Sequence, residues 1–397
     1  MKQNWEYKKL GEICCPKKEI ARAGKIFSQS DLIKYIDIAS IDNNAHALLA
    51  LESIFFSDAP SRAQQKTEKN DILISLVRPN LKKIAVVDIS DNNLVASSGF
   101  CVLRSNNLSV NKFIYYTCIS DSFTKNMVSL TNGANYPAIR EDDVRNYVIP
   151  VPPLSTQTAI VSELDALSAI IADHKSLLKK YDELEQSIFY YMFGDPVKND
   201  KGWEVKKLGE VCEVVTKGTT PTTVGFKFEE EGINFIKVEC FENGVLNMAK
   251  VAHVTEQCHE SLKRSQLKEN DILICIAGAT VGKLAIVTKE ILPANTNQAC
   301  CIIRLSQSYV ESRSYIFFIL QSDYIKNYIK GLKKGVAQPN LTLDQVRNFL
   351  IPNVPLPLQQ EFASKIEAIE AMKADTKKSL AKSEELFNAR MDYYFNA

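Results

Sequence analysis

Short runs of apolar and β-branched residues, separated by polar turns, dominate the first part of the chain. Residues 72–77 and 84–89 are two such runs around one turn, and residues 99–104 form a third. This pattern predicts paired strands. Residues 111–127 and 309–329 instead have helical patterns, and Thr342 with Gln345 has the spacing of a capping box. The sequence therefore predicts mixed α+β structure.

A different pattern begins after Pro152 and Pro153. Apolar positions then recur at alternating spacings of four and three residues, which is typical of a coiled-coil seam. The seam consists of Ile160, Leu164, Leu167, Ile171, His174, Leu178, Tyr181, Glu185, Ile188 and Met192. Gly194 and Pro196 predict where this helix ends. The pattern predicts a helix of about 40 residues, ~60 Å long.

A second seam of the same kind lies at the end of the chain. Pro357 can open this helix, because its missing N–H would be unpaired there in any case. The seam residues are Phe362, Ile366, Ile369, Leu380, Phe387 and Tyr394. We expect the two long helices to pair antiparallel.

The chain is a tandem repeat. Residues 5–14 and 203–212 are identical at eight of ten positions, and residues 70–74 recur unchanged at 270–274. The period of about 200 residues is far longer than that of solenoid repeats, which is ~20–50 residues. The repeat predicts a pseudo-twofold plan with four segments. They are a mixed domain at 1–150, a helix at 151–197, a mixed domain at 198–352 and a helix at 353–397.

Composition narrows the class of protein. The chain has 397 residues, 45% of them hydrophobic and 24% charged, with a net charge of +1. These values exclude wholesale disorder. There is no apolar run of ~20 residues and no apolar signal region at the start, so we expect a cytoplasmic chain without a membrane span. The two mixed domains carry net charges of +3 and +2, and the helices −4 and −1.

Cysteine and histidine do not form a recognisable metal motif. The ten cysteines include no C-x-x-C pair, and only four histidines are present. We expect reduced, mostly buried thiols and no metal. His174 on the seam is interpreted as a tolerated polar position, because the corresponding residue of the second helix is Thr376.

The duplicated plan by itself leaves two functions open. Two similar domains held apart by long helices could read successive faces of the DNA major groove, which recur every ~34–36 Å. A scaffold that only spaces its partners fits the same pattern.

Three motifs carry a resemblance to a known family. Trp-x-x-x-x-Leu-Gly-Glu opens each copy, at Trp5 and Trp203. A Pro-rich signature precedes each helix, at 149–154 and 351–358, followed by Gln157 and Gln359, and residues 184–194 end the first helix. With the duplicated plan, these motifs resemble the specificity subunits of type I restriction-modification systems.

The resemblance implies two target-recognition domains, each reading one half of a split site in double-stranded DNA. It also implies two conserved helices that set the spacing and dock two modification subunits. The chain itself would be non-catalytic. Modification subunits would methylate adenine with S-adenosylmethionine, and restriction subunits would translocate and cleave DNA with ATP and Mg²⁺.

One candidate for DNA contact is a glycine-rich turn. Residues 278–283 have three residues between the glycines, and Leu284 follows the lysine, whereas a phosphate loop needs four residues and then Ser or Thr. We interpret the segment as a tight turn from which Lys283 contacts a DNA phosphate; a solvated lysine is the alternative. The first copy has Arg78, Lys82 and Lys83 there and lacks the glycines, so its turn should differ.

Further candidates lie in loops of both copies. Hydroxyls and lysines can position phosphates, and Asn and Gln amides can pair with adenine edges. The candidate DNA-binding residues are Lys217, Thr219 and Thr220, then Lys333, Lys334, Gln338 and Asn340, and in the first copy Asn135, Tyr136 and Arg140. Plain surface turns, or loops that pack against the helix base, remain alternatives.

A self-sufficient DNA methyltransferase is a competing function. It needs an Asp/Asn-Pro-Pro-Tyr/Phe tetrapeptide, but the one Pro-Pro pair is flanked by Val151 and Leu154.

Overall fold

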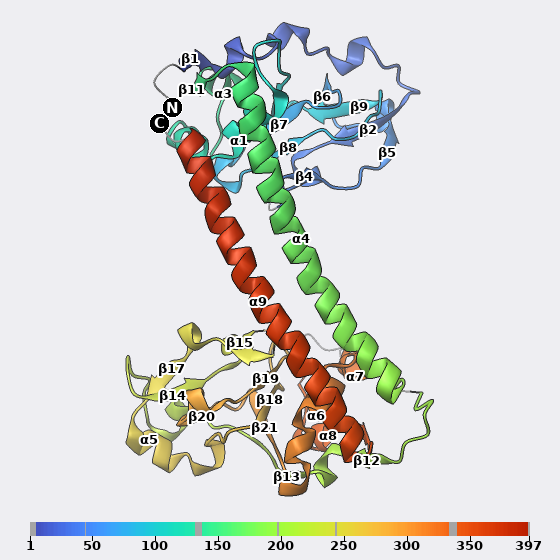
Figure 1. The fold of residues 1–397 in the computed structure, drawn as a ribbon, viewed down its shortest axis with the longest axis vertical. Coiled ribbons are helices and arrows are strands. Elements are labelled where there is room, and N and C mark those ends of the chain that lie inside the picture. The colour runs from blue at the N-terminus through green and yellow to red at the C-terminus, as the bar shows by residue number, and fades with distance from the viewer. Residues whose placement is uncertain are drawn as a thin grey trace. The chain divides into compact units, whose positions relative to one another are not determined.

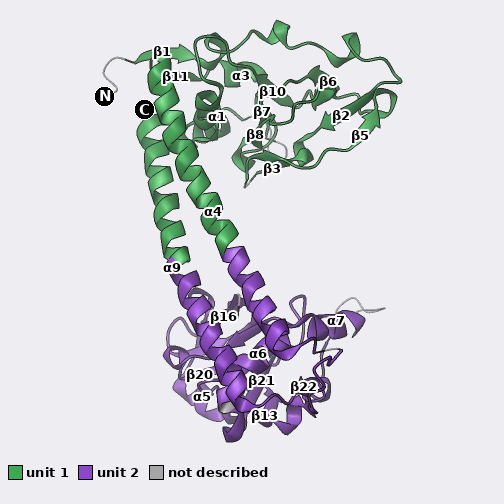
Figure 2. Cartoon of the chain, turned by 45° about the vertical axis from the view of Figure 1, so that its right-hand side comes forward, with its two compact units in different colours: residues 1–177, 376–397 green, residues 178–375 purple. Residues whose placement is uncertain are grey.

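The structure is a computed structural model, and it describes residues 5–43, 45–131, 137–196, 198–242, 244–332 and 340–395. The chain forms two compact units (Figure 2). Unit 1 contains residues 1–177 and 376–397, and unit 2 contains residues 178–375. Each unit thus combines one predicted mixed domain with part of both predicted long helices.

Unit 1 contains a three-stranded antiparallel sheet and a second, four-stranded sheet (Figure 1). The order of the first is β10–β7–β8 and that of the second is β5–β2–β9–β6. The strands are β10 (Phe100–Leu103), β7 (Ile72–Ser75), β8 (Ile84–Val86), β5 (Ser53–Phe55), β2 (Leu32–Ile36), β9 (Leu94–Ser97) and β6 (Ala63–Lys66). The strands predicted at 72–77, 84–89 and 99–104 are confirmed, and they pair antiparallel in one sheet. Every residue of β7 and β10 is buried.

Unit 2 repeats this plan. Its main sheet has the order β13–β21–β18–β19, and a three-stranded sheet has the order β17–β14–β20. The strands are β13 (Cys212–Lys217), β21 (Cys300–Leu305), β18 (Ile272–Cys275), β19 (Leu284–Ile286), β17 (Ala252–Val254), β14 (Ile233–Ile236) and β20 (Ala294–Thr296).

The remaining short elements join these sheets to the helices. In the pair β1 with β11 and the pair β12 with β22, the second strand shortly precedes a long helix in the sequence. Two further strand pairs and three short α-helices lie beside the sheets. They are β1 (Glu6–Lys9) with β11 (Val148–Val151), β12 (Val205–Lys207) with β22 (Leu350–Pro352), β3 (Ile41–Asp42) with β4 (Ala47–Leu48), β15 (Phe241–Glu242) with β16 (Val245–Leu246), α3 (Glu141–Arg145), α5 (Glu256–Ser261) and α8 (Leu343–Arg347). The capping box predicted at Thr342 and Gln345 is present at α8.

The helical stretches predicted at 111–127 and 309–329 are each broken in two. The first forms α1 (Asn111–Ile119) and α2 (Asp121–Ser129), and the second forms α6 (Arg313–Gln321) and α7 (Asp323–Leu332). Ser120 has extended backbone angles, and its hydroxyl accepts a hydrogen bond from the Phe123 N–H. A serine that caps a new helix cannot continue the preceding one, which explains the break.

The Leu-Gly-Glu motif has the same packing role in both copies. A Cβ on Gly11 would lie 3.2 Å from the Arg145 carbonyl oxygen, and one on Gly209 would lie 3.2 Å from the Arg347 Cβ. Arg145 then donates to the Cys15 and Val102 carbonyls, and Arg347 donates to the Val215 carbonyl. The glycine is therefore needed because the short helix packs directly against it.

The long helices are α4 (Leu154–Phe193) and α9 (Leu356–Phe395), and their segments pair antiparallel within each unit. In unit 1, Glu163 contacts Arg390 and Lys175 contacts Glu384. In unit 2, Glu185 contacts Lys373, and the rings of Phe189 and Phe362 are 5.8 Å apart. Gly194 takes a φ of +78° directly after α4, as its predicted capping role requires.

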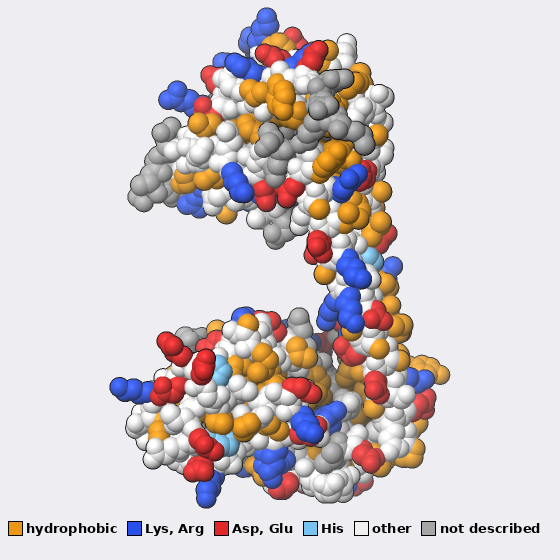
Figure 3. Space-filling view, turned by 60° about the vertical axis from the view of Figure 1, so that its left-hand side comes forward, with side chains coloured by type: hydrophobic (Ala, Val, Ile, Leu, Met, Phe, Trp, Pro, Cys, Tyr) orange, Lys and Arg blue, Asp and Glu red, His pale blue; other side chains and the backbone are white. Residues whose placement is uncertain are grey.

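Hydrophobic side chains remain exposed along these helices (Figure 3). In the described part of the chain, no helix combines the length and the apolar character that a bilayer span requires.

Candidate nucleic-acid interface

In unit 2, three of the predicted DNA-binding segments meet at one end of the main sheet. Lys217, the last residue of β13, pairs with Cys301, which in turn pairs with Ile274 of β18. The Leu341 N–H donates to the Ile276 carbonyl just beyond β18, at 2.8 Å. Asn340, which is exposed, is therefore held beside the turn that leads to Lys283.

The corresponding end of the unit 1 sheet is built in the same way. The Ile139 N–H donates to the Leu76 carbonyl at 2.9 Å, and the Arg78 N–H donates to the Pro137 carbonyl at 2.8 Å. These bonds bring the exposed residues Arg78 and Arg140 to the end of β7. The segment that precedes each long helix is thus joined to the turn that follows β7 in unit 1 or β18 in unit 2. We call β7 and β18 the central strands.

The loop after β13 is held against β20 by its backbone. A Cβ on Gly218 would lie 2.0 Å from the Thr296 carbonyl oxygen, so only glycine fits there. Thr219 donates its N–H to that oxygen at 3.1 Å and accepts a hydrogen bond from Arg264 at 3.3 Å. The Thr220 carbonyl accepts from Thr223. Lys217 itself is exposed and available for a ligand.

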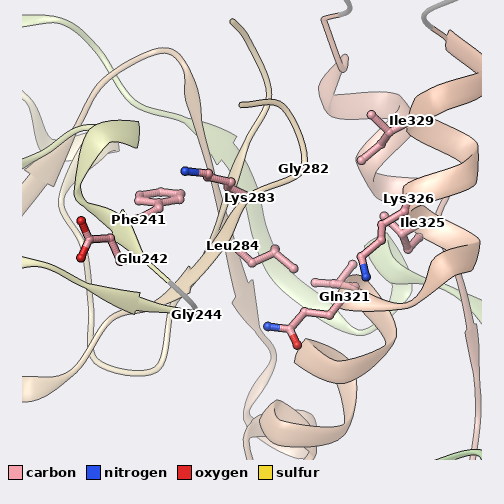
Figure 4. Close-up of a pocket in the computed structure, with 11 residues that line it drawn as sticks. Phe241, Glu242, Gly244, Gly282, Lys283, Leu284, Gln321, Ile325, Lys326 and Ile329 are labelled. Carbon is pink, nitrogen blue, oxygen red and sulfur yellow. The ribbon is translucent and has the colours of Figure 1, made fainter. Parts of the chain in front are cut away.

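The glycine-rich turn of unit 2 borders a cavity of about 380 Å³ (Figure 4). Gly278 and Gly282 have φ angles of +94° and +95°, which agrees with the tight turn predicted there. Lys283 lines the cavity together with Gln321 and Lys326, and all three are at least partly exposed. A Cβ on Gly282 would lie 2.9 Å from Ile329 Cδ1, so the missing side chain helps to keep this space open.

The equivalent turn of unit 1 has the different geometry that the sequence predicted. Arg78 and Lys82 adopt left-handed angles on either side of a short 3-10 helix, Pro79–Leu81. The Lys82 ammonium lies 2.5 Å from Asp121 and lowers the pKa of that carboxyl, and the Lys83 ammonium donates to the Ile41 carbonyl. Lys82 and Lys83 thus already have partners within the unit. The Arg78 side chain is exposed.

The other predicted residues divide into two groups. Arg140 is exposed at the start of α3, where its backbone N–H donates to Asp143 at 2.7 Å. Five predicted residues lie outside the described residues. They are Asn135, Tyr136, Lys333, Lys334 and Gln338.

A run of cations that the sequence analysis missed lies near the end of the unit 1 sheet at which Arg78 and Arg140 lie. Lys17, Lys18, Arg22 and Lys25 line a groove of about 800 Å³, together with Ser98 and Phe100. Four cations within nine residues were a visible signal. The sequence did not show that they share one groove.

The described residues contain no cluster of metal-ligating side chains, and most of the thiols are buried. No group of three or more His, Cys, Asp or Glu side chains there could hold a metal ion. All ten cysteines are free, and eight of them are buried, as predicted. Burial raises the pKa of Cys14, and likewise that of Cys301, to about 12. Such thiols are poor nucleophiles and packing is their role.

The fold and these sheet ends define a duplicated α+β protein in which each copy presents one set of exposed loops. The chain belongs to the family of type I restriction modification DNA specificity domains, whose model matches it twice, at residues 2–186 and 200–386.

Individual relatives agree with this membership. The chain is 22% identical over 316 residues to the type I restriction enzyme MjaIX specificity subunit of Methanocaldococcus jannaschii, covering 76% of this chain and 71% of that one. It is 20% identical to the HindI specificity subunit of Haemophilus influenzae, covering 84% and 85%.

Two solved structures share the fold. One chain, from work on complex assembly and conformational transition of the type I R-M system, is 23% identical with a TM-score of 0.60, covering 99% of this chain and 98% of that one. The S subunit from M. genitalium is 16% identical with a TM-score of 0.55, covering 99% and 96%.

Proposed function

We propose that this chain is the DNA-recognition subunit of a type I restriction-modification complex and that each copy reads one half of a split site. The observation that carries the proposal is the repeated sheet end. In both units a hydrogen bond, Ile139 to Leu76 or Leu341 to Ile276, joins the segment before the long helix to the turn after the central strand. Exposed cations and amides stand on those loops.

The proposal assigns residues 1–150 and 198–352 to two recognition domains and residues 151–197 and 353–397 to helical spacers. Phosphate contacts from Lys217, Lys283 and Arg78 would position the duplex, and loop amides such as that of Asn340 would read base edges. Adenine methylation and DNA cleavage would belong to modification and restriction subunits, which would hold S-adenosylmethionine, ATP and Mg²⁺.

Footprinting of the chain assembled with its modification subunits tests this function. We expect two protected patches on duplex DNA, separated by an unprotected gap. One continuous patch, or none, would contradict reading of a split site. Tight binding of S-adenosylmethionine by the isolated chain would instead favour a self-sufficient methyltransferase.

The exposed flank of the helices supports docking of the two modification subunits. On α4, four exposed apolar residues recur every seven residues, and this spacing keeps them on one side of a coiled-coil helix. They are Ile170 and Leu177 in unit 1 and Leu184 and Tyr191 in unit 2. Tyr191 is 83% exposed, the largest exposed fraction among these four residues.

The opposite flank differs in chemistry. Lys175 and Glu384 form an ion pair at 2.9 Å there; Lys175 follows the seam residue His174, and Glu384 lies between the seam residues Leu380 and Phe387. Ile170 directly precedes the seam residue Ile171, and Leu386 directly precedes the seam residue Phe387. In an antiparallel pair of helices, such positions on the two helices lie on the same side of the seam. Leu386 of α9, also exposed, therefore extends the apolar flank next to Ile170 in unit 1. We name these exposed residues the apolar flank of their unit: Ile170, Leu177 and Leu386 in unit 1, and Leu184 and Tyr191 in unit 2.

A further inference from the structure

The groove lined by residues 17–25 in unit 1 is strongly basic. Between Lys17 and Lys25 the chain has four cations and one acid, Glu19. The other acid in the groove, Glu141, is already neutralised, because Lys17 lies 2.5 Å from it and Arg145 lies 2.8 Å from it.

Three of the cations have no partner in the described part of the chain. Lys18, Arg22 and Lys25 are exposed, and none of them forms an ion pair or side-chain hydrogen bond with another described residue. Like charges brought together in a concave surface repel one another and attract an anion. The groove has a volume of about 800 Å³, which is much larger than a single small ion. It is suited to a polyanion.

A chain of hydrogen bonds links this groove to the predicted DNA-binding residues. The groove wall contains Ser98 and Phe100, and the carbonyl of Gly99 between them accepts from the Leu76 N–H at 2.9 Å. Leu76 in turn accepts from Ile139, the neighbour of Arg140. Gln65 fixes this turn by donating to the Ser97 and Phe100 carbonyls at 2.8 and 2.9 Å. The groove therefore lies at the same end of the sheet as Arg140, whose neighbour Glu141 also lines it.

The second copy lacks this feature. The region that follows the repeated motif in the second copy, residues 213–225, has one cation, Lys217, and Lys227 and three consecutive acids, Glu229 to Glu231, come after it. Gly218 also holds that segment against the Thr296 carbonyl. The regions that follow the repeated motif thus differ in charge between the two copies, although both copies have the same arrangement of sheets and long helices.

We propose that the groove of residues 17–25 binds consecutive phosphates of duplex DNA beside the half-site read by the first copy. This inference rests on the proposed function and adds an asymmetry to it, because the groove contributes salt-dependent affinity from the first half of the chain. Because phosphates carry no sequence information, the groove strengthens binding without changing which bases are read.

The test compares two triple variants of the full chain, assembled with its modification subunits. The first is Lys18→Gln, Arg22→Gln and Lys25→Gln. The control is Lys69→Gln, Lys268→Gln and Lys289→Gln, which neutralises three exposed lysines near the opposite ends of the two central strands. Binding of cognate and of unrelated duplex DNA is measured between 50 and 300 mM salt, with thermal unfolding as a check on folding.

We expect the groove variant to reduce the slope of log affinity against log salt by about 2 to 3, because each phosphate that is no longer neutralised lowers the slope by about 0.9. The ratio of cognate to unrelated affinity should stay within about threefold. The control should change the slope by less than about 1. Equal slopes in the two variants overturn the proposal, and so does a disappearance of the sequence preference, because phosphate contacts alone would not remove it. If the wild-type complex itself has no preference for a split site, the proposed function fails instead.

Discussion

Asp271 and Arg304 form two parallel hydrogen bonds, from Nε to Oδ1 at 2.8 Å and from Nη2 to Oδ2 at 2.7 Å. Asp71 and Arg104 repeat this geometry 200 residues earlier, with both distances at 2.8 Å. Both carboxylates are buried directly before β7 or β18, and the arginines lie on the neighbouring strand, Arg304 within β21 and Arg104 directly after β10. The ion pair therefore fixes the register of the main sheet in each copy.

Asp271→Ala should destabilise unit 2 by about 3 kcal/mol, because it leaves the half-buried Arg304 guanidinium without its partner. Hydrogen exchange of β18 and β21 measures the effect. Glu269→Ala, which removes an exposed carboxylate two residues away, is the control and should cost less than about 0.5 kcal/mol. Equal protection of β18 in the two variants would show that the ion pair does not hold the sheet together.

Exchange of residues 1–150 for another recognition domain should change one half of the recognised site and leave the other half intact. The physical reason is that each unit has its own core, built from its own sheets and helices. Sequencing of methylated sites in cells that carry the exchanged chain measures the outcome. A change in both halves would contradict independent reading by the two copies.

Leu177→Glu and Leu184→Glu should each weaken binding of the modification subunits at least tenfold, about 1.4 kcal/mol, because a carboxylate would enter an apolar interface. Both residues belong to the apolar flank of α4. Ser176→Glu introduces the same charge on an exposed neighbouring position outside that flank and is the control. Complex formation is measured by analytical ultracentrifugation; if all three variants bind equally, docking on this flank is wrong.

Lys217→Gln combined with Lys283→Gln should reduce the salt dependence of DNA binding by about 2 units of slope, because two phosphates would no longer be neutralised. Both lysines are exposed at the same end of the unit 2 sheet. Salt titration of the assembled complex measures the slope, with Lys289→Gln as the control. An unchanged slope would remove these two residues from the interface.

The ion cluster between the long helices in unit 2 predicts a pH dependence of stability. Lys373 lies between Asp182, Glu185 and Glu370, at 2.8, 2.7 and 3.0 Å. Burial raises the pKa of Glu185 to about 7, and its Oε1 atom has no hydrogen-bond partner in the described structure. A carboxyl whose pKa rises on folding stabilises the fold at low pH, and this contribution disappears as the pH rises through the folded value.

Unit 2 should accordingly lose stability between about pH 4.5 and pH 7 through this group. Glu185→Gln should remove that loss and raise stability at pH 8 by roughly 1 kcal/mol, because a neutral amide replaces a poorly solvated charge. Denaturant unfolding of the chain at pH 5 and pH 8 measures it. Equal pH dependence in the wild type and in Glu185→Gln would exclude Glu185 as the titrating group.

Much of the architecture could be predicted from the sequence because it depends on local patterns. The seam positions from Ile160 to Met192 are spaced so that a helix places them on one side, whatever they contact. The strand at 72–75 needs only a short apolar run to be recognised. The repeat of Trp5 at Trp203 shows the duplication without any knowledge of the fold.

The breaks at Ser120 and Ser322 were not predicted, because an apolar helical pattern continues across both serines. The site was only partly predictable for a related reason. Lys82 looks like a candidate for DNA contact in the sequence, but only the fold places Asp121, 39 residues away, beside its ammonium group.

What the sequence by itself determined is the duplicated plan, the long helices and the family resemblance, since these follow from spacing and identity along the chain. What only the tertiary structure decided is which cations are already paired and which share a surface. Lys18, Arg22 and Lys25 line one groove with Ser98 and Phe100, which are more than 70 residues away along the chain. Charge acts through space, so its meaning depends on neighbours that the order of residues does not show.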